Sequence, residues 1–248
     1  MNILILTDFS PQAYNAARYA LNSNSGSSKF YVLHASSTGV ASKIDEALLD
    51  FVARLKKEPA ATGHSFYTLP FSDNLINATR KAVTEKRIDL IVMGASGKNT
   101  SNFQGLGGNT CNVVKKVKCP VLVVPNCGFK QWERLYLPLD LRFPVHTEAL
   151  QLLQNLPVSP NVSLDVWEFN LKNSEAQIED LHLPNYKLNR KTLNKESDFF
   201  GKFWPEANVK ANIIVFFARQ LHITEKLLNR LSATETRKQN LPVLILHG

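Results

Sequence analysis

The sequence has few of the residues and segments that mark secreted or membrane-bound proteins. It contains only three cysteines, Cys111, Cys119 and Cys127, which form neither a CxxC pair nor a disulfide framework. No apolar run approaches the ~20 residues that a membrane-spanning helix needs. The first residues, MNILILTDFSPQ, lack the basic start and the small-residue cleavage site of a secretory signal. These absences predict a cytoplasmic protein with no membrane partner.

Recognised catalytic and metal-binding patterns are also missing. The sequence has no HExxH and no GxSxG motif, and none of its six histidines belongs to a metal-ligand pattern. Asp8 has no partner base or metal cluster nearby in the sequence. Cys111 has two interpretations, a redox-active thiol or an inert one, and the inert thiol is favoured. We therefore expect no catalytic residues and no metal site, which favours a binding protein over an enzyme.

The chain is basic, with a net charge of +8 from 29 Lys and Arg against 21 Asp and Glu. The densest cluster of positive charge is KKVK, residues 115–118. A nucleic-acid surface is one explanation, but no aromatic residues are interleaved with the cluster and no nucleic-acid-binding motif is present. A solvated helix face is favoured, and a positive field that attracts a small anion is a third interpretation. We expect no nucleic-acid partner.

The first half alternates apolar runs with helical patterns. The runs are NILILTD, KFYVLHA, SFYTLPF, IDLIVMG and CPVLVVP, and each is typical of a strand in a parallel sheet. Between them apolar residues recur at helical spacing, and Ser10-Pro11 is a typical helix start. This order predicts an open parallel α/β sheet with right-handed crossovers. Ligands of such sheets bind at the carboxyl ends of the strands, where Asp8, Ala35 and Gly94 lie.

The second half repeats the same order in a weaker form. RLYLPLDL resembles the first run, SLDVWEF the second, ANIIVFFA the fourth and LPVLILHG the fifth. We therefore predict two tandem domains, residues 1–126 and 132–248, whose last strands are suited to pair with each other. The polar stretch 171–194 shows little periodicity and is predicted to be a long loop. Bulky residues replace the glycines of the first copy, with Phe216 placed opposite Gly94.

Glycine is concentrated in one segment. Five of the 11 glycines lie in GASGKNTSNFQGLGGNT, residues 94–110, between a predicted strand and a predicted helix. The spacing excludes a Walker A loop because Gly97-Lys98 is followed by Asn99 instead of Ser or Thr. It also excludes a GxGxxG fingerprint because position 110 is Thr. A different phosphate loop, or a simple surface turn, is left.

The remaining pattern is Gly94-x2-Gly97-x9-Gly107, followed by the start of a helix. Glycine at the strand end would let a flat ring or a sugar lie against the backbone. The helix start would offer free N–H groups to a phosphate, and Thr110 and Lys98 would add a hydroxyl and a mobile cation. On spacing alone, this interpretation and a turn-only surface loop are equally favoured.

Three stretches carry a family resemblance. ILILTDFSPQAYNAARYAL, RIDLIVMGASGK and GNTCNVVKKVKCPVLVVP together resemble the universal stress protein family, whose nucleotide-binding members carry G-x2-G-x9-G-[ST] after the fourth strand. The resemblance covers the first half, and the second half resembles a degenerate domain of the same family. It implies two tandem open parallel-sheet, Rossmann-like domains of the adenine nucleotide alpha hydrolase-like type that form a pseudo-dimer. Further association into a homodimer is left open.

The resemblance also implies an ATP, ADP or AMP site in the first domain, and it leaves a role for magnesium open. Residues at the strand ends would hold the adenosine moiety, and residues at the helix start would hold the phosphates through backbone N–H groups. The residues that would line the nucleotide are Asp8, Ala35, Met93, Gly94, Gly97, Lys98, Gly107, Gly108, Asn109 and Thr110.

One position departs from the family pattern. Gly108 stands where nucleotide-binding members have Ser or Thr, so a side-chain donor is missing. A hydrogen bond to a charged group contributes ~1.5–3 kcal/mol, which is roughly ten- to over a hundredfold in affinity. We expect weakened binding, in a stress-response protein whose nucleotide acts as a conformational ligand. The alternatives are a scaffold that binds no nucleotide and a slow ATPase; the absence of SGGxDS and HxGH motifs disfavours nucleotidyl transfer.

Overall fold

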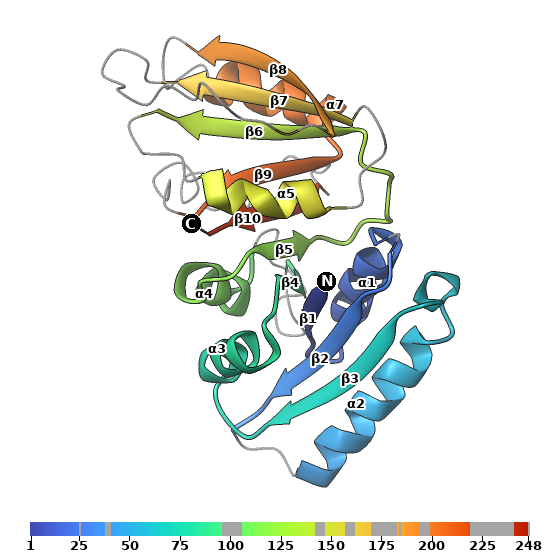
Figure 1. Ribbon diagram of the computed structural model, residues 1–248. Coiled ribbons are helices and arrows are strands. Elements are labelled where there is room, and N and C mark those ends of the chain that lie inside the picture. Colours follow the sequence, from blue (N-terminus) through green and yellow to red (C-terminus); the bar gives the residue numbers. More distant parts are fainter. Residues whose placement is uncertain are drawn as a thin grey trace.

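The fold is described from a computed structural model of the chain (Figure 1), for residues 1–24, 26–37, 41–95, 106–141, 147–156, 162–169, 183, 185–193, 199–218 and 241–247. Strands and helices alternate along most of it. In chain order the elements are β1 (Asn2–Leu6), α1 (Pro11–Asn22), β2 (Lys29–Ala35), α2 (Ala41–Leu55), η1 (Pro59–Ala61), β3 (Ser65–Phe71), α3 (Leu75–Lys86), β4 (Leu90–Gly94), α4 (Gly108–Lys116), β5 (Val121–Val124), β6 (Arg134–Asp140), η2 (Thr147–Leu150), α5 (Gln151–Asn155), β7 (Val162–Phe169), β8 (Tyr186–Leu193), η4 (Phe199–Phe203), α7 (Trp204–Lys210), β9 (Ile213–Phe217) and β10 (Val243–Leu246).

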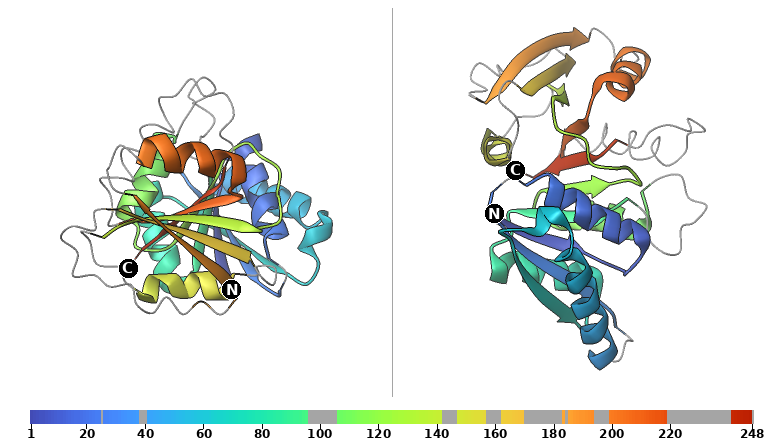
Figure 2. Two further views of the ribbon diagram at one scale, coloured as in Figure 1. Left: turned by 90° about the horizontal axis from the view of Figure 1, so that it is seen from above. Right: turned by 90° about the vertical axis from the view of Figure 1, so that its right-hand side faces the viewer.

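The strands form a single sheet in the order β3-β2-β1-β4-β5-β10-β9-β6-β7-β8. Helices cover both of its faces (Figures 1 and 2). From either end of the sheet inward, the strands of a half follow in the order third, second, first, fourth and fifth. The second half of the chain therefore repeats the arrangement of the first. Neighbouring strands are parallel within each half, and β5 pairs antiparallel with β10 where the halves meet. The predicted α/β fold with a tandem arrangement is confirmed, whereas the domain limits 1–126 and 132–248 stay a prediction.

β1 shows why continuous apolar runs become central strands. Ile3 and Ile5 belong to the core beneath α1, α2 and α5, whereas Leu4 belongs to the core beneath α3, α4 and α7. All three side chains are fully buried. Because successive side chains of a strand point to opposite faces, a strand with helices on both sides needs apolar residues at every position.

Two helices of the first half begin at side-chain caps. The Ser10 hydroxyl accepts a hydrogen bond from the Ala13 N–H at 3.1 Å, and Pro11 occupies the first turn of α1. At α3 the side-chain oxygen of Asn74 accepts the N–H of Asn77 at 3.0 Å. Such caps satisfy donors that have no partner inside the helix and contribute about 1 kcal/mol each. The helix start predicted at Ser10-Pro11 is confirmed.

The loop predicted for residues 171–194 is wrong in its last part. Tyr186–Leu193 form β8, which pairs in parallel with β7 along its whole length. β8 lies at the edge of the sheet; only its end residues Tyr186 and Leu193 are buried, and Lys187 and Arg190 are exposed. Charged residues are common on edge strands because they discourage pairing with other chains, and they also hide the apolar signal by which a strand is recognised. Residues 171–182, 184 and 194 lie outside the described residues.

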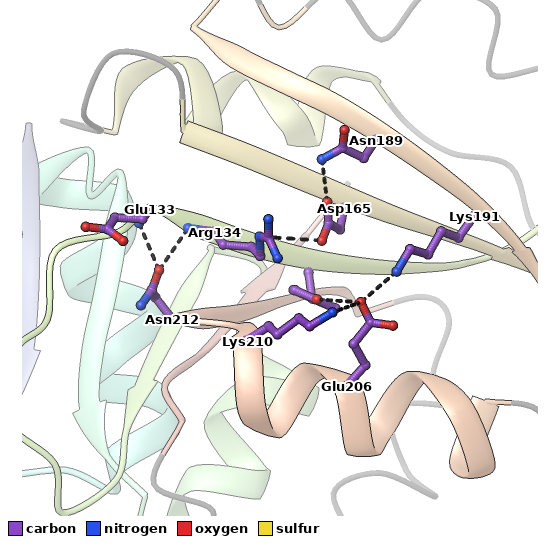
Figure 3. A network of polar contacts seen from close by, with 9 residues as sticks. Glu133, Arg134, Asp165, Asn189, Lys191, Glu206, Lys210 and Asn212 are labelled. Atoms are coloured by element: carbon purple, nitrogen blue, oxygen red, sulfur yellow. Dashed lines mark hydrogen bonds and ion pairs between the residues drawn. The ribbon is translucent and has the colours of Figure 1, made fainter.

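A polar network lies beneath β7 and β8 in the second half (Figure 3). Glu206 of α7 accepts hydrogen bonds from Lys191 at 2.6 Å and Lys210 at 3.3 Å. Burial alone would raise the pKa of Glu206, but the hydrogen bonds of the two lysines outweigh it and lower that pKa. The buried carboxylate of Asp165 accepts the side-chain N–H of Asn189 at 2.7 Å. Paired charges thus form part of the contact between the sheet and α7 in the second half.

The segment between the two halves, residues 125–133, is hydrogen-bonded to α1. The Asn15 side chain donates hydrogen bonds to the carbonyls of Pro125 at 3.1 Å and Cys127 at 3.0 Å. The indole N–H of Trp132 donates to the Tyr19 hydroxyl at 2.8 Å, and both rings are buried. Burial raises the pKa of Tyr19 far above its usual range, so the hydroxyl stays neutral. Among the helices that the structure describes, none combines the length and the apolar character of a membrane span.

Replacing Tyr19 by Phe will destabilise the fold, because the buried indole N–H of Trp132 loses its acceptor. An unsatisfied buried donor costs about 1–3 kcal/mol, which will appear as a lower midpoint of urea denaturation. Tyr67, an exposed tyrosine of β3, provides the matched control, and Tyr67→Phe will change the free energy of unfolding by less than about 0.5 kcal/mol. Equal effects of the two variants would contradict the role given to the Tyr19–Trp132 bond.

Candidate functional site

The candidate site lies at the carboxyl ends of the central strands of the first half. β1 lies between β2 and β4 and is parallel to both. Asp8 follows β1, Ala35 is the last residue of β2 and Gly94 is the last residue of β4. Parallel neighbours end at the same edge of the sheet, so the topology brings these three predicted residues to one end. The corner after β1 and the start of α4 are the other two parts of the candidate site.

The corner after β1 is held by short-range hydrogen bonds. The N–H of Ser10 donates to the Asp8 carboxylate at 3.0 Å, and the N–H of Phe9 donates to the Thr7 hydroxyl at 2.9 Å. Phe9 has a φ of 62°, a left-handed conformation that costs a non-glycine residue roughly 1–2 kcal/mol. Its ring packs on His34, with ring centroids 4.5 Å apart. This corner fixes one oxygen of the Asp8 carboxylate and orients its side chain.

Phe9 was not identified as a site residue from the sequence. Its residue type gives no signal, because phenylalanine rarely adopts a left-handed conformation. The conformation follows from the tight passage from β1 to α1, with the ring of Phe9 held by His34 and Phe51. Strained residues of this kind are frequent at functional sites. A ring nitrogen of His34 lies 2.8 Å from the Thr7 carbonyl oxygen, which holds the imidazole against the same corner.

The start of α4 differs from the starts of α1 and α3. Its N-cap is Gly107, which has no side chain and makes no capping hydrogen bond. The N–H of Cys111 already bonds to the Gly107 carbonyl at 3.0 Å, whereas the N–H groups of the first turn have no acceptor within a helix. Gly108 and Asn109, which carry two of them, are exposed. The first turn of α4 therefore presents N–H donors and the positive end of the helix dipole to solvent.

Two hydrogen bonds join this first turn to the end of β4. The Gly107 N–H donates to the Ala95 carbonyl at 2.8 Å, and the Thr110 hydroxyl donates to the Gly94 carbonyl at 3.0 Å. Thr110 is 2% exposed. The predicted phosphate-binding helix start and the predicted adenosine-binding strand end are thus held side by side.

The remaining predicted residues divide into two groups. The Met93 side chain is buried in the core beneath α3 and α4, so its backbone is the part that reaches the sheet end. Gly97 and Lys98 lie outside the described residues. In the part of the chain that the structure describes, no three His, Cys, Asp or Glu side chains gather as a metal site would require.

The corresponding strand end of the second half is filled. Gly94 pairs with Val124 in the first half, and the equivalent pair in the second half is Phe217 with Leu246. The sequence alignment, which places Phe216 opposite Gly94, is wrong by one residue. The connection from β9 to β10 is one residue shorter than that from β4 to β5, and this difference shifts the match. The side chain of Phe217 is buried and lies where Gly94 has only backbone.

Two thiols of the first half have a raised pKa: Cys111 in α4, beside the site, and Cys119, at the opposite end of the strands, before β5. Burial raises the pKa of the Cys111 thiol, an effect that Lys115 partly offsets. Burial raises the pKa of Cys119 to about 12, and its sulfur lies 3.5 Å from the Ile88 carbonyl oxygen. Since the thiolate is the reactive form, a raised pKa predicts slow reaction of both thiols at neutral pH. This supports the interpretation of Cys111 as an inert thiol.

Alkylation with iodoacetamide at pH 8 will be slower at Cys111 than at free cysteine and slowest at Cys119. A raised pKa lowers the thiolate fraction at any pH below it, so both rates will still be rising above pH 9. Peptide mass spectrometry gives the rate at each thiol, and the urea-unfolded chain serves as the control in which they become equal. Faster labelling of native Cys111 than of free cysteine would contradict the inert interpretation.

Comparison with known proteins agrees with this architecture. The model of the universal stress protein family matches residues 1–125, and a search of curated proteins finds no match. A universal stress protein from Archaeoglobus fulgidus is 12% identical, with 98% of this chain and 95% of that chain covered and a TM-score of 0.61. The functionally unknown protein PA1789 from Pseudomonas aeruginosa is 14% identical, with 99% and 92% covered and a TM-score of 0.55. A third structure, a universal stress protein in complex with cAMP, is 23% identical over 51% of this chain and 98% of that chain, with a TM-score of 0.39. This chain belongs to the universal stress protein family.

Proposed function

We propose that the first half of the chain binds one adenine nucleotide, ATP or a related form, and that the nucleotide acts as a conformational ligand. The observation that carries the proposal is the start of α4, which has no side-chain cap and lies against the end of β4. The nucleotide would lie across the strand ends, with its adenosine moiety near Asp8 and Ala35 and its phosphates at the helix start.

Two features at the start of α4 support phosphate binding there: its partial positive charge and the open space at Gly108. Exposed N–H groups in the first turn of a helix, together with the helix dipole, favour anions. A Cβ atom built on Gly108 would meet nothing within 4 Å, so a phosphate oxygen can approach the backbone here. Since the cap residue Gly107 has no side chain, no hydroxyl or carboxylate of its own competes with the phosphate for these donors.

The adenosine end of the proposed site rests on Asp8 and Gly94. A carboxylate accepts hydrogen bonds from ribose hydroxyls, and the bond from the Ser10 N–H already holds the Asp8 carboxylate in place. Gly94 leaves the end of β4 without a side chain, which lets a sugar or a flat ring approach the backbone. The backbone groups of Ala35 at the end of β2 would meet the edge of the adenine ring.

The second half is proposed to support the first without binding nucleotide itself. The buried side chain of Phe217 occupies the position of Gly94, and a phenyl ring there prevents close approach to the backbone. In this proposal the two halves behave as a pseudo-dimer joined through β5 and β10. The resulting stoichiometry is one nucleotide per chain.

Titration calorimetry with ATP will show one binding site per chain. Asp8→Asn will weaken binding roughly ten- to a hundredfold, the effect of losing a hydrogen bond to a charged group, because the amide keeps an oxygen for Ser10 but not the charge. Asp140, the last residue of β6 and the counterpart of Asp8 in the second half, is the matched control, and Asp140→Asn will leave the affinity unchanged. The absence of binding heat from the parent chain at millimolar ATP, or a stoichiometry of two sites per chain, would contradict the proposal. Several turnovers per second with magnesium would show an enzyme instead.

A hydroxyl placed at position 108 will strengthen the binding of ATP. The open space at Gly108 accommodates a new side chain, so Gly108→Ser adds a donor to the phosphates without displacing a neighbour. A gain of roughly tenfold or more is expected from a hydrogen bond to a charged group. Gly108→Ala is the matched control, because it adds the Cβ without the hydroxyl. Equal affinities of the Ser and Ala variants would contradict the placement of the phosphates at this turn.

A further inference from the structure

The Thr110 hydroxyl has a partner within the chain. It donates to the carbonyl oxygen of Gly94 at 3.0 Å, across a sequence separation of 16 residues. A threonine hydroxyl carries a single proton, so a hydroxyl that donates to Gly94 does not donate to a phosphate at the same time. Its 2% exposure also removes it from the surface that a ligand would reach.

A second hydrogen bond also attaches the start of α4 to the end of β4. The Gly107 N–H donates to the Ala95 carbonyl at 2.8 Å, so two consecutive carbonyls at the end of β4 both accept from the first turn of α4. One of these bonds comes from the backbone and depends on no side chain. The other depends on the Thr110 side chain, which makes Thr110 the residue whose substitution changes the attachment of the helix start.

We propose that Thr110 is a positioning residue that sets the preference of the site for phosphorylated over unphosphorylated nucleosides. This inference rests on the proposed function and deepens it. The field of a helix start falls off within its first turn, and hydrogen bonds to N–H groups depend steeply on distance and angle. A helix start that is held less firmly therefore binds phosphates less well, whereas the adenosine moiety, held by the strand ends, is unaffected. Gly108 and Asn109, which are exposed, present the N–H groups that Thr110 holds in place.

The test compares Thr110→Val, which removes the hydroxyl and keeps the shape, with Thr110→Ser, which keeps the hydroxyl. Dissociation constants for ATP and for adenosine are measured on the full chain by calorimetry. Thr110→Val will raise the dissociation constant for ATP about tenfold, a change of about 1.4 kcal/mol, with that for adenosine unchanged within twofold. Thr110→Ser will keep the parent ratio of the two constants. A purely structural role would weaken both ligands equally in Thr110→Val, and that result, or an unchanged ratio, overturns the proposal.

Amide hydrogen exchange without ligand separates this proposal from the proposed function. Thr110→Val will speed the exchange of the Gly107 and Cys111 amides, whose acceptors are the carbonyls of Ala95 and Gly107, and Thr110→Ser will not. The amide of Ala13 in α1 is the internal control and will exchange at the parent rate in both variants. A parent chain that binds neither ATP nor adenosine overturns the proposed function and the selectivity with it. Unchanged exchange in Thr110→Val overturns the positioning role alone.

Discussion

The antiparallel pairing of β5 with β10 joins the strands of the two halves into one sheet. Both strands are four residues long and fully buried, and Leu122 lies opposite Leu244 in an antiparallel ladder. Without this ladder each half would expose the backbone groups of a buried apolar strand, which is a template for aggregation. The cores on both faces of the sheet continue across the joint. The joint therefore explains why the chain keeps a second half that has lost the glycines of the first.

The two copies have diverged in ways that suit different roles. The first keeps Gly94 at a strand end and an uncapped helix start beside it, both of which leave backbone groups within reach of a ligand. The second has Phe217 at the equivalent position, and it has placed a network around Glu206 where a helix meets the sheet. In our proposal one copy binds the nucleotide and the other completes the sheet. β5 follows α4 directly in the chain, so a nucleotide at the start of α4 would be connected to the joint through a single short helix.

Much of the fold could be predicted because burial leaves a local pattern. Central strands such as β1 are apolar at every position, since both of their faces are covered, and Ser10 with Pro11 marks a helix start through chemistry that involves only adjacent residues. The tandem order could be predicted because the same pattern occurs twice. β8 could not be recognised, because exposed polar residues interrupt the apolar pattern of this edge strand. The roles assigned to the site residues stay a prediction, since they come from spacing and from a family resemblance.

Three features of the fold can be read from the amino-acid sequence alone: which segments are buried, in what order the strands and helices follow, and where a glycine-rich connection leaves the sheet. Which groups contact one another depends on how the folded chain is packed. The bond from Thr110 to Gly94 joins residues that are distant in the chain, the match of Phe217 with Gly94 depends on strand register, and the left-handed conformation of Phe9 depends on the corner around it. Apolar periodicity is a local property that survives in the sequence, whereas register, hydrogen-bond partners and strain arise only when distant segments are packed together.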